Sequence, residues 1–499
     1  MIYRKKLLTK KQDVLSLSYG AFNKGIDTKH DDNILPHRLG KMMYNYDAKE
    51  GSLRCGYGFS ELMLPKYEDS GELRKISPLT DEGGGLDKLW FFRYYNEVDN
   101  KQTNYVFCHG LDNAFYYFRI FSVSGGRVPL GNKTMENPTG IVYMIDGQDC
   151  VIFTSPTDDM LVATNGSITL FQDAPKICSM CVHYERVFAI LDGTGKKLAF
   201  SANLDPTNWD DNLDDAGYIE MADERGRLIK VISFNDYVYV FRENGVTRVS
   251  GYGDQLQFSV TNMFVTNSLI YGETVTVCEN KVLFLARDGV HVFSGASAYK
   301  LDLGIEKLFE GVYNDNAKGL FWNGRYYLAC RLNFNDGEVI GQENENYKNN
   351  ALLEIDTKTY ELKIMRGVDI SDMIAVEDGQ VSKLIATFRG EHIDKLGMLD
   401  ESGELFGTPL KKVWVSPFSN LGYPGKLKRI KELTIETAED CSVKIRTERE
   451  EKMYDVKLSE HPQRIRTDVT GEKAEISFIS NGSGNLKISC PTVTIGIVK

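Results

Sequence analysis

Two cysteines are the first residues in this sequence whose spacing could do chemistry. The stretch 177-ICSMC-181 holds a CxxC pair, and two thiols at this spacing can bind zinc or act as a redox couple. No second CxxC and no nearby pair of histidines follows, and the flanks are apolar and typical of a strand. Buried structural cysteines are the simpler interpretation, so no metal site is predicted.

An aspartate-rich stretch is the second candidate. The segment 203-NLDPTNWDDNLDDAG-217 places five aspartates within eleven residues, enough carboxylates to chelate calcium or to supply the acid pair of a glycosidase. It lacks the 1, 3, 5 ligand spacing and the terminal glutamate of an EF-hand loop. The default interpretation is an exposed loop between strands, anchored by Pro206 and Trp209.

No other motif indicates a catalytic centre. The seven histidines are scattered and never fall at i, i+4 on a helical pattern. No Gly-x-Ser-x-Gly elbow is present, which a serine hydrolase of that type would need. The glycines 83–85 precede no Lys-Ser/Thr pair and open no helix, so they do not form a phosphate-binding loop. The sequence therefore predicts no catalytic residue, no cofactor and no metal: the protein is expected not to be an enzyme.

The elements that would position these residues repeat along the chain. The hairpin 235-NDYVYVFRENGVTRVSG-251 aligns with 279-ENKVLFLARDGVHVFSG-295 at a constant offset of 44 residues, and 320-LFWNGRYYLACRL-332 continues the spacing. Weaker copies lie on either side. Each alternates apolar and polar residues and breaks at Gly, Asn or Asp, where a tight hairpin needs positive φ.

A period in the low forties with about four short strands is typical of a β-propeller blade. The roughly 315 residues between Leu86 and Asp400 then correspond to about seven blades. A closed ring buries both faces of each blade and leaves only short edges. The alternative is two stacked sandwiches with accidental spacing.

The chain changes character after Pro409, where the 44-residue spacing is lost while the alternation persists. This pattern predicts a small antiparallel β-sandwich. We therefore expect an all-β protein: an N-terminal segment over residues 1–70 that contributes a closing strand, a propeller of about seven blades over 71–410, and a C-terminal sandwich over 411–499. The strand 14-VLSLSYGAF-22 is the candidate for closing the ring.

The composition argues against two classes of function, nucleic-acid binding and membrane insertion. A net charge of −11 argues against a dedicated nucleic-acid binder, since such proteins neutralise phosphates with a basic surface. No apolar run approaches the roughly 18 residues of a membrane helix, so membrane insertion is not expected. Nine cysteines without regular spacing in 499 residues indicate reduced thiols and a cytosolic product.

Four phrases together resemble a known group of proteins. They are the opening 20–59, with Leu35-Pro36, Asn45 and a Gly51-x-Leu-Arg phrase; 184–211, with Asp205-Pro206-Thr207-x-Trp209; the pair of hairpins above; and 414-WVSPFSNLGYPGKLKRIKEL-433. They are similar to the propeller-containing neck and tail proteins of tailed bacteriophages, known as packaged-DNA stabilisation, tail hub or nozzle proteins. Ala21-Phe22-Asn23 stands where a second glycine is common in that group, and residues 335–350 have no counterpart in it.

The resemblance implies a non-enzymatic structural protein of the virion, made in the host cytoplasm and placed in the neck or tail. Copies would form a homo-oligomeric ring around the DNA exit channel and stabilise packaged DNA. The expected partners are other neck, tail or portal-adaptor proteins, with genomic DNA in the lumen and no sequence-specific binding. Candidate assembly or loop residues are Asp205, Pro206, Trp209, Asp210, Asp211 and Trp414.

A second function stays open: a carbohydrate-binding or glycan-cleaving propeller that acts in receptor recognition. Such a propeller should bring two or more carboxylates and several aromatic rings to one end of its channel. A structural ring should instead carry its unusual residues on the outer loops. A third interpretation is a bacterial interaction scaffold of the same shape.

Overall fold

The computed structural model describes most of the chain from Asp13 to Ile497. The residues outside this description are 1–12, 20–21, 23–24, 38, 69, 80–83, 97–99, 124–125, 165, 172–173, 192–194, 211–214, 254, 336–345, 483, 485 and 498–499. The expected insertion at 335–350 lies largely outside it.

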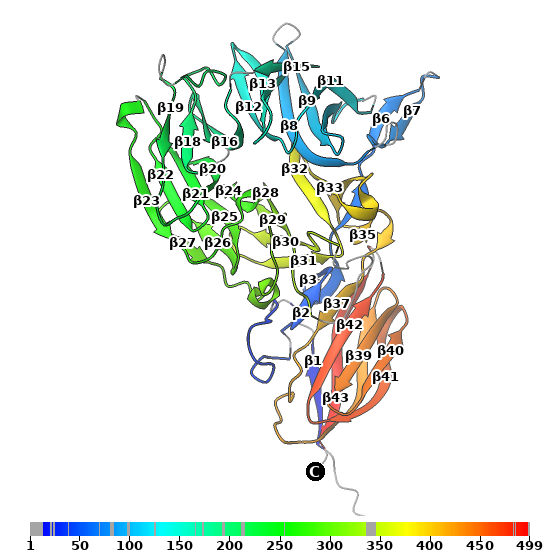
Figure 1. The fold of residues 1–499 in the computed structure, drawn as a ribbon. Helices are drawn as coiled ribbons and strands as arrows, with labels where there is room; N and C mark the ends of the chain where they lie inside the picture. Colours follow the sequence, from blue (N-terminus) through cyan, green and yellow to red (C-terminus); the bar gives the residue numbers. More distant parts are fainter. Residues whose placement is uncertain are drawn as a thin grey trace, which may run out of the picture.

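In the described part of the chain, six four-stranded antiparallel sheets and one six-stranded sheet form the seven blades (Figure 1). Blade 1 consists of β8 (Leu86–Asn96), β9 (Lys101–Gly110), β10 (Ala114–Arg119) and β11 (Val128–Thr134). Blade 2 consists of β12 (Thr139–Ile145), β13 (Gln148–Thr154), β14 (Met160–Thr164) and β15 (Ser167–Phe171). Blade 3 consists of β16 (Ile177–His183), β17 (Arg186–Leu191), β18 (Lys197–Phe200) and β19 (Gly217–Glu220). Blade 4 consists of β20 (Leu228–Phe234), β21 (Tyr237–Arg242), β22 (Gly245–Val249) and β23 (Val260–Val265).

The remaining three blades complete the ring. Blade 5 consists of β24 (Thr276–Cys278), β25 (Lys281–Ala286), β26 (Gly289–Phe293) and β27 (Ala298–Lys300). Blade 6 consists of β28 (Lys318–Trp322), β29 (Arg325–Cys330), β30 (Ala351–Asp356) and β31 (Leu362–Arg366). Blade 7 consists of β32 (Ile370–Asp378), β33 (Val381–Phe388), β34 (Leu396–Asp400) and β5 (Gly58–Glu61), extended by β35 (Glu404–Leu405) and β36 (Thr408–Pro409). Short 3-10 turns are η1 (Gln255–Gln257), η2 (Gly272–Thr274), η3 (Glu306–Phe309) and η4 (Gly390–His392), and a hairpin of β6 (Leu64–Tyr67) and β7 (Leu73–Ile76) stands apart.

The ring is closed by a strand from the N-terminal segment, but not by the one expected. β5 pairs with β34, with Gly58 opposite Asp400 and Glu61 opposite Gly397. The prediction that residues 14–22 close the propeller is wrong: β1 (Asp13–Ser18) pairs antiparallel with the last strand, β43 (Lys487–Ile497). Leu15 and Leu17 face the sandwich core, and their alternation fits any sheet with one buried face.

Apolar side chains form a core between each pair of neighbouring blades. One of these cores joins the two ends of the ring, because Leu86 and Leu89 of blade 1 pack with Ile374 and Ile385 of blade 7. Each such side chain, when fully buried, stabilises the fold by about 1.5–3 kcal/mol. Ring closure is therefore part of the hydrophobic core, and the prediction of an all-β propeller of about seven blades is confirmed.

The sandwich is built from both ends of the chain. One sheet has the order β3 (Tyr46–Lys49), β4 (Ser52–Cys55), β43, β38 (Lys428–Thr437) and β41 (Ser459–Gly471), with β1 also on β43. The other has the order β2 (Met42–Tyr44), β37 (Lys412–Val415), β42 (Ala474–Ser480), β39 (Cys441–Thr447) and β40 (Glu451–Val456). Four of the eleven described sandwich strands thus come from residues 13–55, ahead of the propeller in the sequence.

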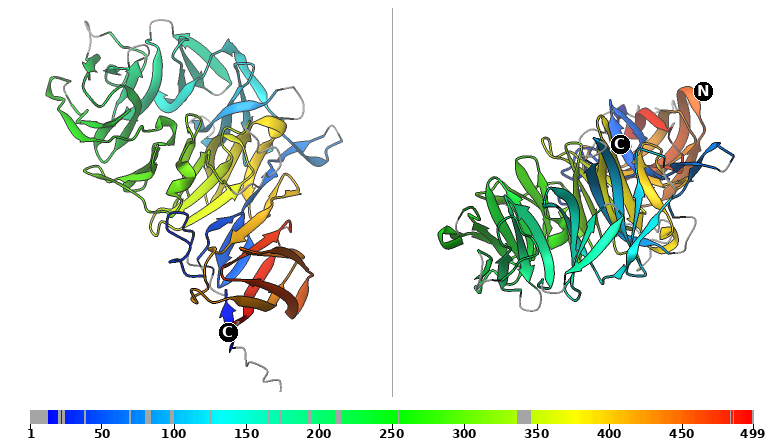
Figure 2. Two further views of the ribbon diagram at one scale, coloured as in Figure 1. Left: turned by 60° about the horizontal axis from the view of Figure 1, so that its bottom comes forward. Right: turned by 90° about the horizontal axis from the view of Figure 1, so that it is seen from above.

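The two bodies share one continuous core. The largest cluster of buried side chains includes Leu283 and Leu328 of blades 5 and 6, Tyr44 of the N-terminal segment, and Val443 of the sandwich. The sandwich therefore extends from one side of the propeller, below blade 6 (Figures 1 and 2). The polypeptide passes from the sandwich into the propeller and back again, so two chain segments connect the two bodies.

Hydrogen bonds and ion pairs also connect the propeller and the sandwich at this junction. The buried side-chain amide of Asn45 donates to the carbonyl oxygens of Lys411 (2.7 Å) and Arg366 (3.1 Å), and its own oxygen accepts from the Arg366 N–H (2.8 Å). Lys363 of β31 pairs with Asp47 of β3 at 3.1 Å and lies 3.7 Å from Glu354, which also pairs with Arg325. Burial raises the pKa of the Glu354 carboxyl, against the lowering effect of Lys363 and Arg325.

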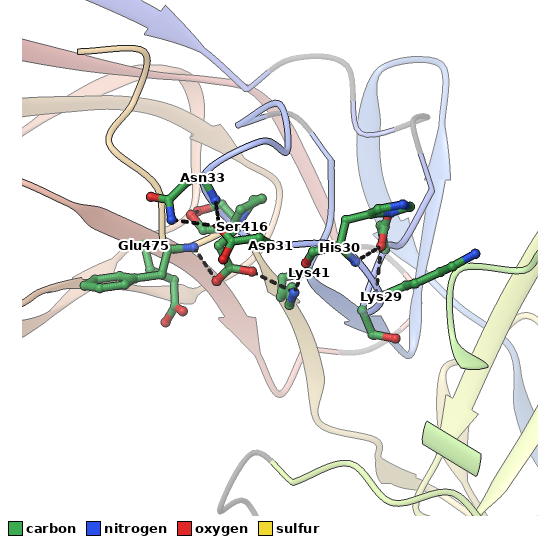
Figure 3. Close-up of polar contacts among 12 residues, drawn as sticks. Lys29, His30, Asp31, Asn33, Lys41, Ser416 and Glu475 are labelled. Atoms are coloured by element: carbon green, nitrogen blue, oxygen red, sulfur yellow. Dashed lines mark hydrogen bonds and ion pairs between the residues drawn. The ribbon is translucent and has the colours of Figure 1, made fainter. Parts of the chain in front are cut away.

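The loop between β1 and β2 is docked onto the sandwich by a second polar group (Figure 3). Lys41 donates to the carbonyl oxygen of His30 (3.0 Å) and pairs with Asp32 at 2.6 Å. Asp32 also accepts from the N–H of Phe418, in the segment after β37 (3.1 Å). These contacts hold the N-terminal loop against the C-terminal half of the chain.

Candidate functional site

Charged side chains gather at one mouth of the propeller channel. They line a cavity of about 790 Å³ on the face that carries the connections between blades. The polar side chains of this lining include Lys88, Asn137, Lys230, Glu273, Lys318 and Asp372. They come from blades 1, 4, 6 and 7, the 1–2 connection and η2, so only the closed ring brings them together.

Glu273 is the centre of this group. Its carboxylate lies 3.2 Å from the ammonium of Lys230 on β20 and 3.1 Å from that of Lys318 on β28. One carboxylate in η2 thus links the first strands of blades 4 and 6, beside blade 5, whose own first strand has only three residues. Lys230 and Lys318 hold the pKa of Glu273 well below its usual range.

Lys88 and Asp372 occupy the other side of the cavity. The Lys88 ammonium donates to Asn137 Oδ1 and to the Pro138 carbonyl oxygen, both at 2.6 Å, and burial lowers its pKa. Asp372 accepts the N–H of Leu89 at 2.9 Å, and burial raises its pKa. These contacts join the first strand of blade 1 to blade 7 and to the 1–2 connection.

The chemistry that Glu273 and Asp372 could perform is limited, because both carboxylates already have partners within the protein. Two carboxylates with pKa values shifted in opposite directions are the pattern of an acid and a base. Here, however, Glu273 and Asp372 each already accept from protein donors. Of the described residues that line the cavity, only Trp90 and Phe388 are aromatic. Among the described residues, no three His, Cys, Asp or Glu side chains are placed to hold a metal ion. The arrangement acts first as a set of ionic links between blades.

Replacing Glu273 with glutamine should lower stability in a pH-dependent way. Its pKa is lowered in the folded state from a usual value near 4.5, so its stabilising effect is present above about pH 4.5 and disappears as the pH falls. Half of the side-chain surface faces the lumen, so water screens the pairs and we expect about 0.5–1 kcal/mol at pH 7. Urea unfolding of both proteins between pH 3 and 7 measures the difference.

The matched control is Glu136→Gln, which changes an exposed glutamate on the connection between blades 1 and 2. It should match the parent protein across this pH range. A Glu273→Gln deficit that stays constant down to pH 3 would show that the carboxylate charge is not what stabilises the ring.

The described residues of the aspartate-rich loop, Asp205, Pro206, Trp209 and Asp210, lie together on the opposite face of blade 3. Asp205 is exposed and accepts from the N–H (3.0 Å) and hydroxyl (2.7 Å) of Thr207. Pro206 is buried, and its carbonyl oxygen accepts from the indole of Trp209 (3.0 Å), which packs on the core between blades 2 and 3. Asp210 is exposed, and Asp211 lies outside the described residues. The loop is thus anchored by Pro206 and Trp209.

The prediction that Trp414 is an assembly or loop residue is wrong, because it lies in a strand of the sandwich. It is fully buried in β37, with its ring 5.1 Å from that of Phe22 and 5.6 Å from that of Phe478. Strand β37 is an inner strand of its sheet, between β2 and β42. Its side chain therefore points into the sandwich core.

The cysteine pair also differs from the expectation. Cys181 packs against the core between blades 3 and 4, but Cys178 is exposed and lines the channel cavity. The β16–β17 register shifts between Ile177 and Ser179, and such a bulge turns a side chain to the other face of the sheet. The prediction of two buried cysteines is therefore wrong for Cys178.

A group of exposed apolar side chains on blades 3 and 4 was missed by the sequence analysis. We call it the outer-loop surface; it consists of Tyr184, Leu204, Tyr252 and Leu256, whose exposed fractions are 50%, 66%, 68% and 89%. The rings of Tyr184 and Tyr252 are 4.9 Å apart, and the N–H of Leu204 donates to the Glu185 carbonyl oxygen at 2.9 Å. A hollow of about 460 Å³ lies beside them. The only local signal is a tyrosine at a hairpin turn and another between two glycines.

Comparisons with known proteins add little beyond the fold class. No protein-family model and no curated protein matches this chain. Among solved structures, BBS1N in complex with ARL6DN aligns with a TM-score of 0.41 and 7% identity over 68% of this chain and 97% of that one. The extracellular domain of the hybrid two-component system BT4673 from B. thetaiotaomicron aligns with a TM-score of 0.44 and 12% identity over 92% of this chain and 64% of that one. Likeness at this level carries no argument about function.

The search for membrane segments gives one finding. In the described part of the chain, no helix has the length and apolar character that crossing a membrane requires.

Proposed function

We propose that this protein is a non-enzymatic structural component of a tailed-phage virion, a part of the neck or tail that forms an oligomeric ring around the DNA exit channel. Its copies would stabilise packaged DNA without reading its sequence, in contact with other neck, tail or portal-adaptor proteins. The motifs given above motivate the virion placement, and the architecture supplies the mechanical argument.

The observation that carries the proposal is the junction between propeller and sandwich. The chain crosses it twice, a common core runs through it, and the buried Asn45 and the Lys363–Asp47–Glu354 group complete it. Separating the two bodies would expose this shared core and leave buried polar groups without partners, so we expect them to move as one block. A rigid block of this kind suits a ring that must hold its shape under load.

Imaging the purified full-length protein tests the proposal. Negative-stain micrographs and mass photometry at micromolar concentration should show closed rings of several copies, and images of the parent particle should place the protein below the portal. A protein that stays monomeric and binds a polysaccharide array would contradict this function.

One observation favours the second candidate, a glycan-active propeller: Glu273 and Asp372 share one cavity and have pKa values shifted in opposite directions. Under this function, Asp372→Asn and Glu273→Gln should each abolish binding or cleavage of a polysaccharide in the array. If the parent protein has no activity on the array, the glycan function has no support.

A further inference from the structure

The outer-loop surface is bordered by acidic side chains as well as carrying exposed apolar ones. Glu185, Asp205 and Asp236 are exposed around it, and the Tyr184 hydroxyl donates to Asp236 Oδ1 at 3.3 Å. Arg186, which lines the hollow beside this surface, is nearly buried and is already paired with Asp215. Exposed aromatic rings within an acidic rim fit a partner that carries both apolar and basic side chains.

The first twelve residues of this chain have that composition. The segment MIYRKKLLTKKQ contains five basic and no acidic residues, together with Ile2, Tyr3, Leu7 and Leu8. The rest of the chain is therefore more acidic than the overall −11. These residues lie outside the described structure and precede β1.

The position of β1 decides which surface this segment can reach. Asp13, at the start of β1, pairs with Ile497 at the pole of the sandwich, and blades 3 and 4 lie at the opposite end of the molecule in the views of Figures 1 and 2. Twelve extended residues span about 40 Å. A compact chain of this length already measures about 60 Å across, and this one is elongated. The segment therefore meets blades 3 and 4 of another copy more readily than its own.

We propose that residues 1–12 of one copy bind the outer-loop surface of a neighbouring copy, with the apolar side chains on Tyr184, Leu204, Tyr252 and Leu256 and the basic side chains on the acidic rim. The contact is heterologous, since the sandwich pole of one copy meets the propeller of the next. Heterologous contacts of this kind generate rings when the rotation closes. As an assembly contact, the inference rests on the proposed function.

Peptide binding tests the contact directly. A labelled peptide of residues 1–12 is titrated with the full-length protein, and its fluorescence anisotropy should show saturable binding. Tyr184→Ala and Tyr252→Ala should each weaken binding about tenfold, as expected for aromatic anchors. Tyr313→Ala is the matched control, because Tyr313 is 65% exposed and lies on the connection between blades 5 and 6, on the other face of the ring. It should leave binding unchanged.

Two further peptides separate a specific contact from charge attraction. A scrambled peptide keeps the charge, and a peptide with Ile2, Leu7 and Leu8 replaced by serine keeps the basic positions; both should bind at least tenfold more weakly. Equal binding of the scrambled peptide, equal binding to Tyr252→Ala, or no saturation up to about 1 mM would each overturn the proposal.

Mass photometry of the full chain with Leu7→Ser and Leu8→Ser links the contact to assembly. These changes should shift rings to monomers. Unchanged rings would overturn the inference and leave the proposed function standing, whereas specific peptide binding by a protein that forms no rings would support the inference and count against the proposed function.

Discussion

Replacing Gly58 with alanine is expected to destabilise the protein by about 3 kcal/mol, because the added methyl group has no space. A Cβ atom at Gly58 would lie 2.3 Å from the carbonyl oxygen of Glu404, 2.5 Å from its nitrogen and 2.5 Å from Ser402 Oγ. Two of these three atoms are backbone. They belong to the chain that runs along the other edge of β5, so β5 must move away from β34 or β35.

Movement of β5 also disturbs the core, since the neighbouring Phe59 is fully buried and its ring lies 5.1 Å from that of Phe388. Chemical denaturation measures the loss, and limited proteolysis between β34 and β37 should become faster. Gly484→Ala is the control, because a Cβ there meets only ordinary contacts at 3.7 Å and beyond. Equal stability of the two variants would show that β5 is not needed to close the ring.

Trp414→Ala is the second change with a large expected effect. It removes a fully buried indole from the packing of Tyr19, Phe22 and Phe478, which costs about 3–5 kcal/mol. Trp414→Phe keeps most of the ring volume and should lose much less. Trp209→Ala, at a half-buried loop tryptophan, serves as the comparison and should be milder than Trp414→Ala.

This pair of tryptophans separates stability from assembly. Equilibrium unfolding of Trp414→Ala should show a large loss, with any change in oligomeric state following from unfolding. A stable Trp414→Ala protein that had lost only its self-association would restore Trp414 as a surface contact and contradict the burial described above.

The repeating part of the fold was predictable because its determinants are local. A hairpin needs alternation of apolar residues and a turn residue with positive φ, and both lie within one blade. Asn235 and Asp236 adopt positive φ between β20 and β21, and Gly289 does so at the start of β26. The 44-residue offset between blades 4 and 5 therefore predicted the ring.

The N-terminal segment was predicted to close that ring, and only the tertiary structure decided which of its strands does so. An alternating strand such as β1 carries no information about which distant edge it will join. β1 pairs with residues nearly 500 positions away, and β5 joins β34 across more than 300. Both partners become available only when sheets far apart in sequence are assembled.

The candidate sites also differ in whether local sequence or tertiary structure determines them. The aspartate-rich loop was identified from composition, and Asp205 and Asp210 are exposed as a loop requires. The channel group was not predictable, since Lys88 and Asp372 are separated by 284 residues and meet only in the closed ring. Likewise, the burial of Trp414 and the exposure of Cys178 depend on sheet order and on one bulge. The amino-acid sequence by itself determined the blades, because hairpin formation is local; tertiary structure decided which faces are buried and which charges meet, because both depend on long-range strand pairing.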